Sequence, residues 1–166
     1  MRAPVSRWLG GAALVVLVSL AWMQWRSDRA LAPGTLLPLD PGRIDRIELD
    51  IPGQRPQHFQ RRDGHWWRMG AAPQRADADG RLDRIAAIAA APVQRWLPLK
   101  GMDLHTLGLK PPRLILVLNG RRLEYGVMTP FEPGRYVRVG QRIAVIPAQY
   151  TPQAAPAQRV TLPGSP

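Results

Sequence analysis

Residues 114–125 read LILVLNGRRLEY, and this stretch predicts a β-hairpin. Its turn is Asn119-Gly120, a pair that two-residue hairpin turns favour because glycine tolerates a positive φ. The pairs that this turn sets on one side are Leu114 with Tyr125 and Leu116 with Leu123. The residues on the other side are Ile115, Val117, Arg122 and Glu124. We expect the first side to be buried and Arg122, on the second, to be exposed, because side chains alternate between the two faces of a strand.

A second hairpin is predicted around Asp63-Gly64 at residues 63–64. Its register places Trp66 opposite Arg61 on one face and Trp67 opposite Gln60 on the other. Neither face is cleanly apolar. The residues alone therefore leave open which face of this hairpin is core.

The remaining strands are predicted from alternation and from turn residues. Ile47, Leu49 and Ile51 alternate with charged residues, which is typical of a half-buried strand. A last hairpin turns at residues 140–141 between strands at 136–139 and 142–146. Residues 93–99 are expected to form another extended segment.

One main helix is predicted between the second hairpin and residues 93–99. Asp79 is the expected N-cap, and Pro92 ends the pattern. The apolar residues that fall on one helical stripe are Leu82, Ile85, Ile88 and Ala89. Strands, one helix and strands again indicate an α+β domain of antiparallel hairpins packed with that helix. A parallel sheet would need more crossover helices than the sequence contains.

An N-terminal transmembrane helix is predicted to precede this domain. Residues 8–25 carry no charge, and as a helix they would span about 27 Å, close to the apolar thickness of a bilayer. Tryptophans stand near both ends, as interfacial residues do. The bulky residues at its end lack a cleavage pattern, so we expect an uncleaved anchor. Its arginine count is balanced, and the short N-terminal tail favours a cytoplasmic N-terminus with the domain in the periplasm.

The predicted organisation has five parts. Residues 1–7 are a cytoplasmic tail, 8–25 the inner-membrane anchor and 26–43 a linker rich in proline and glycine. Residues 44–147 are the α+β domain, and 148–166 a disordered, proline-rich tail.

Composition argues against several kinds of chemistry. The 166 residues contain no cysteine, and serine is absent from the expected core, which disfavours both common nucleophiles. No histidine pair has the helical spacing of a zinc site, and no complete calcium loop or glycine-rich phosphate loop is present. We therefore expect no catalytic, cofactor-binding or metal-binding residues and a chain that is not an enzyme.

A contact surface is the remaining candidate site. The formal net charge is +11, and the residues that could form such a surface are Trp66, Trp67, Arg61, Arg122 and Arg138. The alternative is that one tryptophan ring lies in the core and the other over the sheet edge, and that the arginines are solvated charges. Anionic lipid headgroups are the more accessible partner for an anchored basic domain, and nucleic acid is disfavoured by the expected placement outside the cytoplasm.

Several short motifs occur along the chain in an order that resembles the one in a known protein family. They are DGHW at 63–66, Pro73 and AD at 76–77, LGLKPP at 107–112, LEYG at 123–126 and RYVR at 135–138. Over roughly residues 36–147 this order resembles the bacterial family called domain of unknown function 4340. The resemblance implies a membrane-anchored envelope protein, in some members associated with ABC-type transporters, and an ABC-type permease as a partner.

The function expected from sequence is that of a non-catalytic, membrane-anchored envelope accessory or binding protein. Two alternatives stay open. One is an anchored envelope enzyme of unrecognised type, and the other is an anchored basic domain that binds anionic lipid or nucleic acid.

Overall fold

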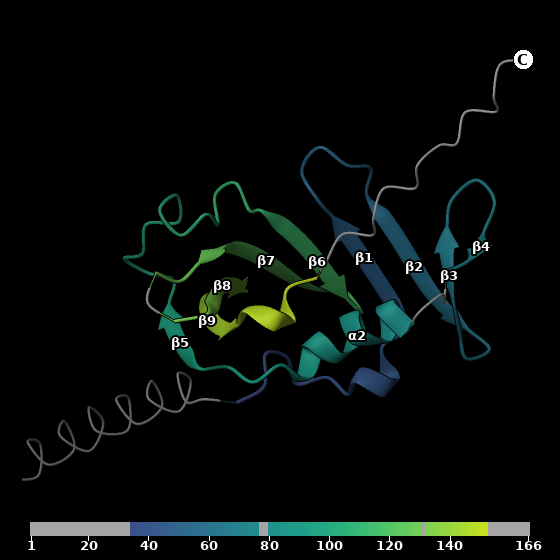
Figure 1. Ribbon diagram of the computed structural model, residues 1–166, viewed down its shortest axis with the longest axis horizontal. Coiled ribbons are helices and arrows are strands. Elements are labelled where there is room, and N and C mark those ends of the chain that lie inside the picture. Colours follow the sequence, from purple (N-terminus) through teal and green to yellow (C-terminus); the bar gives the residue numbers. More distant parts are fainter. Residues whose placement is uncertain (1–33, 77–79, 131, 153–166) are drawn as a thin grey trace, which may run out of the picture.

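The computed structural model describes residues 34–76, 80–130 and 132–152. In this part of the chain nine strands form one sheet in the order β4-β3-β2-β1-β6-β7-β8-β9-β5 (Figure 1). All neighbouring strands are antiparallel. The described residues add one short α-helix and three 3-10 turns. The predicted α+β class with antiparallel pairing is confirmed.

The strands are short. Their bounds are β1 Arg46–Asp50, β2 Gln57–Arg62, β3 His65–Met69, β4 Gln74–Arg75, β5 Arg95–Pro98, β6 Leu114–Leu118, β7 Arg121–Met128, β8 Gly134–Val139 and β9 Arg142–Pro147. The helical elements are η1 Pro41–Arg43, α2 Arg81–Ala87, η3 Ile88–Ala90 and η4 Ala148–Tyr150.

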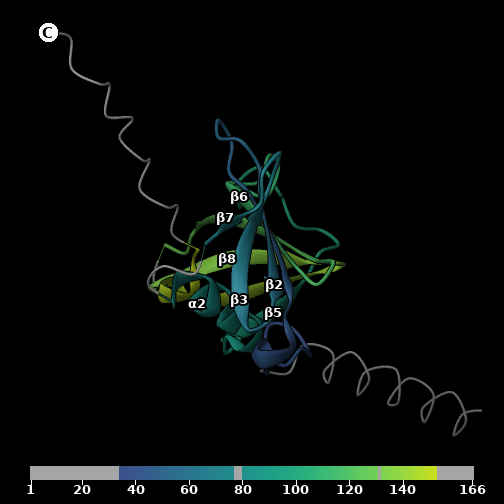
Figure 2. The ribbon, with the colours of Figure 1, turned by 90° about the vertical axis from the view of Figure 1, so that its right-hand side faces the viewer.

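The sheet consists of two meanders joined in its middle. Strands β1 to β4 run in order towards one edge, and β6 to β9 run in order towards the other, with β1 and β6 paired between them. Between the meanders, α2 and η3 carry the chain to β5, which pairs with β9. The sheet is strongly twisted, since β8 runs across the direction of β2 and β3 in Figure 2.

The predicted hairpin registers are confirmed. Leu116 lies opposite Leu123, and Trp66 lies opposite Arg61. Asn119 has a φ of 46°, as the predicted two-residue turn requires. Its side-chain oxygen also accepts hydrogen bonds from the backbone N–H groups of Asp45 and Arg46, at 3.1 and 3.0 Å. The central turn is thereby tied to the start of β1.

The main core lies between one face of the sheet, which we call the inner face, and the α2–η3 segment. The four predicted stripe residues Leu82, Ile85, Ile88 and Ala89 are all buried there, which confirms the helix orientation. Asp79, the expected N-cap, lies outside the described residues. The buried inner-face residues include Ile47, Leu49, Phe59, Trp66, Leu114, Leu116, Leu118, Leu123, Tyr125 and Val137.

A smaller core covers part of the opposite, outer face. The loop at 99–113 folds over β8, β9 and β5, and it buries Leu107, Leu109 and Ile143. This loop comes so close to β7 that a Cβ on Gly126 would collide with the backbone oxygen of Leu107. Two of the short sequence motifs, residues 107–112 and 123–126, are therefore in contact in the folded domain.

The folded domain extends beyond the predicted limits of 44–147 at both ends. Leu36 and Leu37 were assigned to the linker, but they are buried in the core and their N–H groups bond to Ala91 and Ala89 at 2.9 Å. At the other end η4 follows β9, and Pro152 is buried. Leu36, Leu37 and Pro152 are apolar and buried, and the N–H groups of the two leucines are hydrogen-bonded. They therefore pack against the domain although prolines lie near them in the sequence.

Within residues 34–76, 80–130 and 132–152, no helix has the length and apolar character that a membrane crossing requires. The predicted anchor at 8–25 and the tail beyond residue 152 lie outside the described residues.

Candidate functional site

The five predicted contact residues lie on two different faces of the sheet. Trp66 and Arg61 point to the inner face, where Trp66 pairs with Arg61 across β2 and β3. Trp67, Arg122 and Arg138 belong to the outer face, as the strand register requires. The structure therefore does not bring the five together.

Trp66 and Arg61 hold the helix to the sheet. The indole of Trp66 is 2% exposed, and its Nε1–H donates to Asp83 Oδ1 of α2 at 2.9 Å. The Arg61 guanidinium stacks 4.6 Å from the centroid of that indole and forms an ion pair with the same carboxylate. This arrangement satisfies the one polar atom of a buried tryptophan. Trp66 is accordingly a core residue and is not available for surface contact.

Trp67 is half-buried on the outer face near the β4 edge. It lies opposite Gln60 on β2 and Arg75 on β4. Strands β2, β1 and β6 separate its strand from β7, which carries Arg122. Trp67 therefore does not form one surface with the later arginines.

Arg122 and Arg138 are joined through Glu124. The carboxylate of Glu124 accepts from Arg122 Nε at 2.8 Å and from Arg138 Nη1 at 3.2 Å. The Glu124 side chain is 15% exposed, whereas that of Arg122 is 56% exposed. This cluster on β7 and β8 has a net positive charge, and Arg122 presents much of that charge to solvent.

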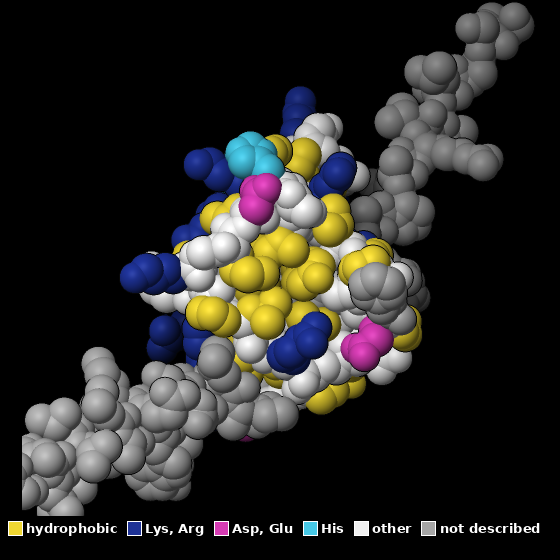
Figure 3. All heavy atoms as spheres, turned by 90° about the vertical axis from the view of Figure 1, so that its left-hand side faces the viewer, with side chains coloured by type: hydrophobic (Ala, Val, Ile, Leu, Met, Phe, Trp, Pro, Cys, Tyr) yellow, Lys and Arg dark blue, Asp and Glu magenta, His cyan; other side chains and the backbone are white. Residues whose placement is uncertain are grey.

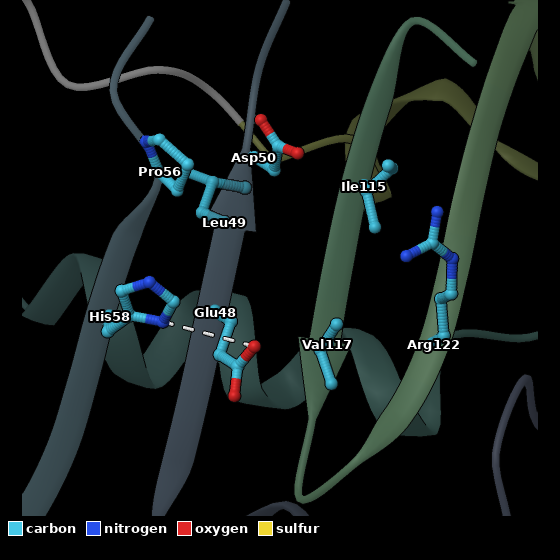
Figure 4. A pocket seen from close by; sticks show the side chains of 8 residues that line it. All are labelled: Glu48, Leu49, Asp50, Pro56, His58, Ile115, Val117 and Arg122. Carbon is cyan, nitrogen blue, oxygen red and sulfur yellow. Dashed lines mark ion pairs between the residues drawn. The ribbon is translucent and has the colours of Figure 1, made fainter. Parts of the chain in front are cut away.

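An open hollow lies beside this cluster in the middle of the outer face (Figure 4). Its volume is about 280 Å³, and we call it the central hollow. Its lining residues are Glu48, Leu49, Asp50, Pro56, His58, Ile115, Val117 and Arg122. Figure 4 shows the side chains of Ile115 and Val117 on β6 between Glu48 on one side and Arg122 on the other. The hollow thus has an apolar floor with opposite charges on its two sides.

The acidic side of the central hollow also holds a histidine. His58 Nδ1 lies 3.9 Å from Glu48 Oε2, on the neighbouring strand. Both side chains remain well exposed, at 53% and 41%. They can therefore exchange this mutual contact for hydrogen bonds to a bound molecule.

A second hollow of about 510 Å³ lies where β1 ends and β6 begins. Its lining combines proline with basic side chains: Ile51, Pro52, His105, Gly108, Lys110, Pro111, Pro112 and Arg113. Gly108 has a φ of 64°, a left-handed conformation that glycine adopts without a Cβ clash.

The groups whose pKa values are shifted, Tyr125 and Asp103, make hydrogen bonds within the fold and do not line the central hollow. Burial raises the pKa of the Tyr125 hydroxyl, which donates to the backbone oxygen of Tyr150 at 3.4 Å. Hydrogen bonds from the Thr106 hydroxyl and the His105 N–H lower the pKa of Asp103. Among the described residues, no group of three or more histidines and carboxylates is placed to hold a metal ion.

Sequence reasoning missed Asp83 and the apolar floor of the central hollow. Asp83 lies in the first turn of α2, and nothing in its local sequence indicates its contact with Trp66. A signal for the floor was present, since the unbroken apolar run 114–118 must place aliphatic side chains on both faces of β6. Its outward members are Ile115 and Val117.

No protein-family model, no curated protein and no solved structure matches this chain.

Proposed function

We propose that this chain is a non-catalytic, membrane-anchored envelope protein whose domain binds a membrane-protein partner through the central hollow. The observation that supports this proposal is a contrast within one sheet face. The loop at 99–113 covers the outer face over β5, β8, β9 and the Gly126 end of β7, whereas the described segments leave it open over β1, β2, β6 and the Arg122 end of β7. An open sheet face with half-buried aliphatic residues is suited to contact with another protein.

The charges around the central hollow favour a protein over a simple ion as its occupant. Glu48 and Asp50 lie on one strand, and Arg122 lies two strands away. A partner with both signs of charge can pair with both sides while its apolar residues cover Ile115 and Val117. Such a surface fixes the orientation of the partner as well as its affinity.

The predicted anchor supports a partner in the same membrane. A domain tethered at residue 34 stays close to the bilayer, and tethering raises its effective concentration near proteins embedded beside it. A weak interface is then sufficient. The resemblance described above favours an ABC-type permease as that partner, in an inner-membrane protein whose domain lies in the periplasm.

Site-specific photocrosslinking in intact cells tests this proposal. A photoreactive residue at Val117 is expected to capture one integral membrane protein in stoichiometric amounts. The same probe at Ala71, an exposed position near the β4 edge, is the control and should capture none. Mass spectrometry of the product identifies the partner and checks whether it is a permease.

A matched pair of variants sharpens the result. Arg122→Glu reverses a side chain that is 56% exposed and should abolish the Val117 crosslink without lowering the melting temperature by more than a few degrees. Arg62→Glu reverses an exposed charge outside the hollow lining and should leave the crosslink intact. A crosslink that survives Arg122→Glu, or a purified chain that hydrolyses an envelope substrate with turnover, would contradict the proposal.

A further inference from the structure

Half-buried apolar side chains gather at the β5 and β9 end of the domain. They pack on the small core of Leu107, Leu109 and Ile143, and they are Leu97, Leu99, Met102, Leu104 and Tyr136. Figure 3 views this end of the molecule and shows apolar side chains in a broad area, with Lys and Arg and some acidic side chains and histidine at its margin. We call these five residues the end patch. None of them lines the central hollow.

The chain around the end patch is basic. Segment 95–113 contains one acidic side chain, Asp103, and four basic ones, which are Arg95, Lys100, Lys110 and Arg113. Lys100 and Lys110 are the two lysines of the whole chain. A lysine stem can lie along an apolar surface while its ammonium group reaches outward. Asp103 directs its oxygens into its own loop, where they accept from His105 N at 2.9 Å and Thr106 Oγ1 at 2.8 Å.

The described chain begins beside β5. The N–H of Val93 donates to the backbone oxygen of Gly34 at 2.7 Å, two residues before β5 starts at Arg95. In Figure 1 the purple start of the described chain lies next to the segment that leads into β5. The predicted anchor ends at residue 25, so eight residues separate it from Gly34. Even fully extended, they span at most about 29 Å.

We infer that the end patch docks on the surface of the same bilayer that holds the proposed anchor, so this inference rests on that part of the proposed function. The apolar side chains enter the boundary between headgroups and acyl chains, and the basic side chains contact anionic headgroups. Surfaces with an apolar centre and basic margins bind membranes in this way. Each basic residue near an anionic leaflet adds attraction within about one Debye length.

Charge separates this surface from the central hollow. The hollow offers both signs of charge, which suits the mixed surface of a protein. Segment 95–113, which carries four of the five end-patch residues, has four basic side chains and one acidic one, which suits a uniformly anionic surface. Docking through the end patch would hold the domain at the bilayer and leave the hollow open to a partner in the membrane.

Nitroxide depth measurements on the full chain in vesicles test the inference. The chain has no cysteine, so Met102→Cys or Lys100→Cys creates a single labelling site, and Ala71→Cys is the control near the opposite edge of the sheet. In vesicles containing phosphatidylglycerol, a label at 102 should meet membrane-dissolved oxygen more often than a water-soluble nickel complex. A label at 71 should show the reverse. Lys100 supplies a second, exposed position if Met102→Cys disturbs packing.

Electrostatics supply the second readout. Salt at molar concentration shortens the Debye length to about 3 Å and should move the label at 102 into water. Lys100→Gln with Lys110→Gln should shift the docked equilibrium towards the undocked state by roughly fivefold for each charge removed. Vesicles of phosphatidylcholine alone should show weaker docking.

The outcomes separate this inference from the proposed anchor. A chain that leaves the vesicles in an alkaline wash overturns the anchor and the inference together. A chain that stays while position 102 is as exposed to water as position 71 overturns only the docking of the end patch. A label at 102 that is shielded from both reagents also overturns it, because the patch is then covered by protein.

Discussion

The β2–β3 and β6–β7 hairpins use the same kind of turn, yet they reach the core by different routes. On the inner face, β6–β7 presents Leu114, Leu116, Leu118, Leu123 and Tyr125, all buried. The same face of β2–β3 presents Phe59 and Trp66 together with Arg61 and Arg68. Its cations stack on its aromatics, with Arg61 over Trp66 and Arg68 over Phe59 at 5.7 Å.

This difference shows that register and burial are separate properties of a hairpin. The β6–β7 hairpin carries its own apolar face and needs only a covering element. In the β2–β3 hairpin the buried face also carries polar groups, and Asp83 of α2 accepts the indole N–H and pairs with Arg61. Substitutions at Leu116, Trp66 and Asp83 test this contrast, and their expected effects decrease in that order.

Leu116→Asp should prevent folding. Leu116 is fully buried, and an unpaired carboxylate there costs more than the roughly 2–5 kcal/mol of a leucine-to-alanine truncation. A domain is held folded by only about 5–15 kcal/mol. Circular dichroism should show no cooperative thermal transition. Arg122→Asp, on the exposed side of the same hairpin, is the control and should melt within a few degrees of the parent chain. Equal tolerance of both changes would contradict the assigned faces.

Trp66→Ala should destabilise the domain by roughly 3–5 kcal/mol, as truncation of a buried aromatic does. Trp67→Ala removes its half-buried neighbour on the other face and should cost about 1–2 kcal/mol. Denaturant unfolding of the two variants measures the difference. If Trp67→Ala proves the more damaging change, the inner face of this hairpin has been assigned incorrectly.

Asp83→Ala should lower the free energy of unfolding by about 1 kcal/mol, because Asp83 is well exposed and its ion pair with Arg61 is screened by solvent. Asp83→Asn keeps an acceptor for the Trp66 N–H and should recover part of the loss. A double-mutant cycle with Arg61→Met isolates the ion pair. A coupling energy of zero would mean that stacking on Trp66, rather than Asp83, positions Arg61.

These two hairpins also show how far the sequence could predict the structure. Turn residues and period-two alternation are local properties, so every predicted hairpin register agrees with the structure. The face of β2–β3 could not be assigned, since neither face is cleanly apolar and Asp83, which contacts Trp66, lies in a helix some twenty residues away. The central hollow needs β1 and β6 as neighbours, and no local pattern specifies that pairing. Leu36 and Leu37 were hidden among prolines that usually indicate a linker.

The packing of Leu36 and Leu37 has a mechanical consequence for a tethered domain. Any tension that reaches the domain through residue 34 acts first on three hydrogen bonds, from Leu36, Leu37 and Val93, and not on the sheet. We therefore expect residues 34–43 to detach from the domain at a lower force than the one that unfolds the sheet. Pulled in optical tweezers by handles at residues 34 and 152, the chain should lengthen first, at low force, by less than the roughly 35 Å contour of ten residues, and then unfold in a larger step. A single step at high force would show that the segment and the sheet yield as one unit.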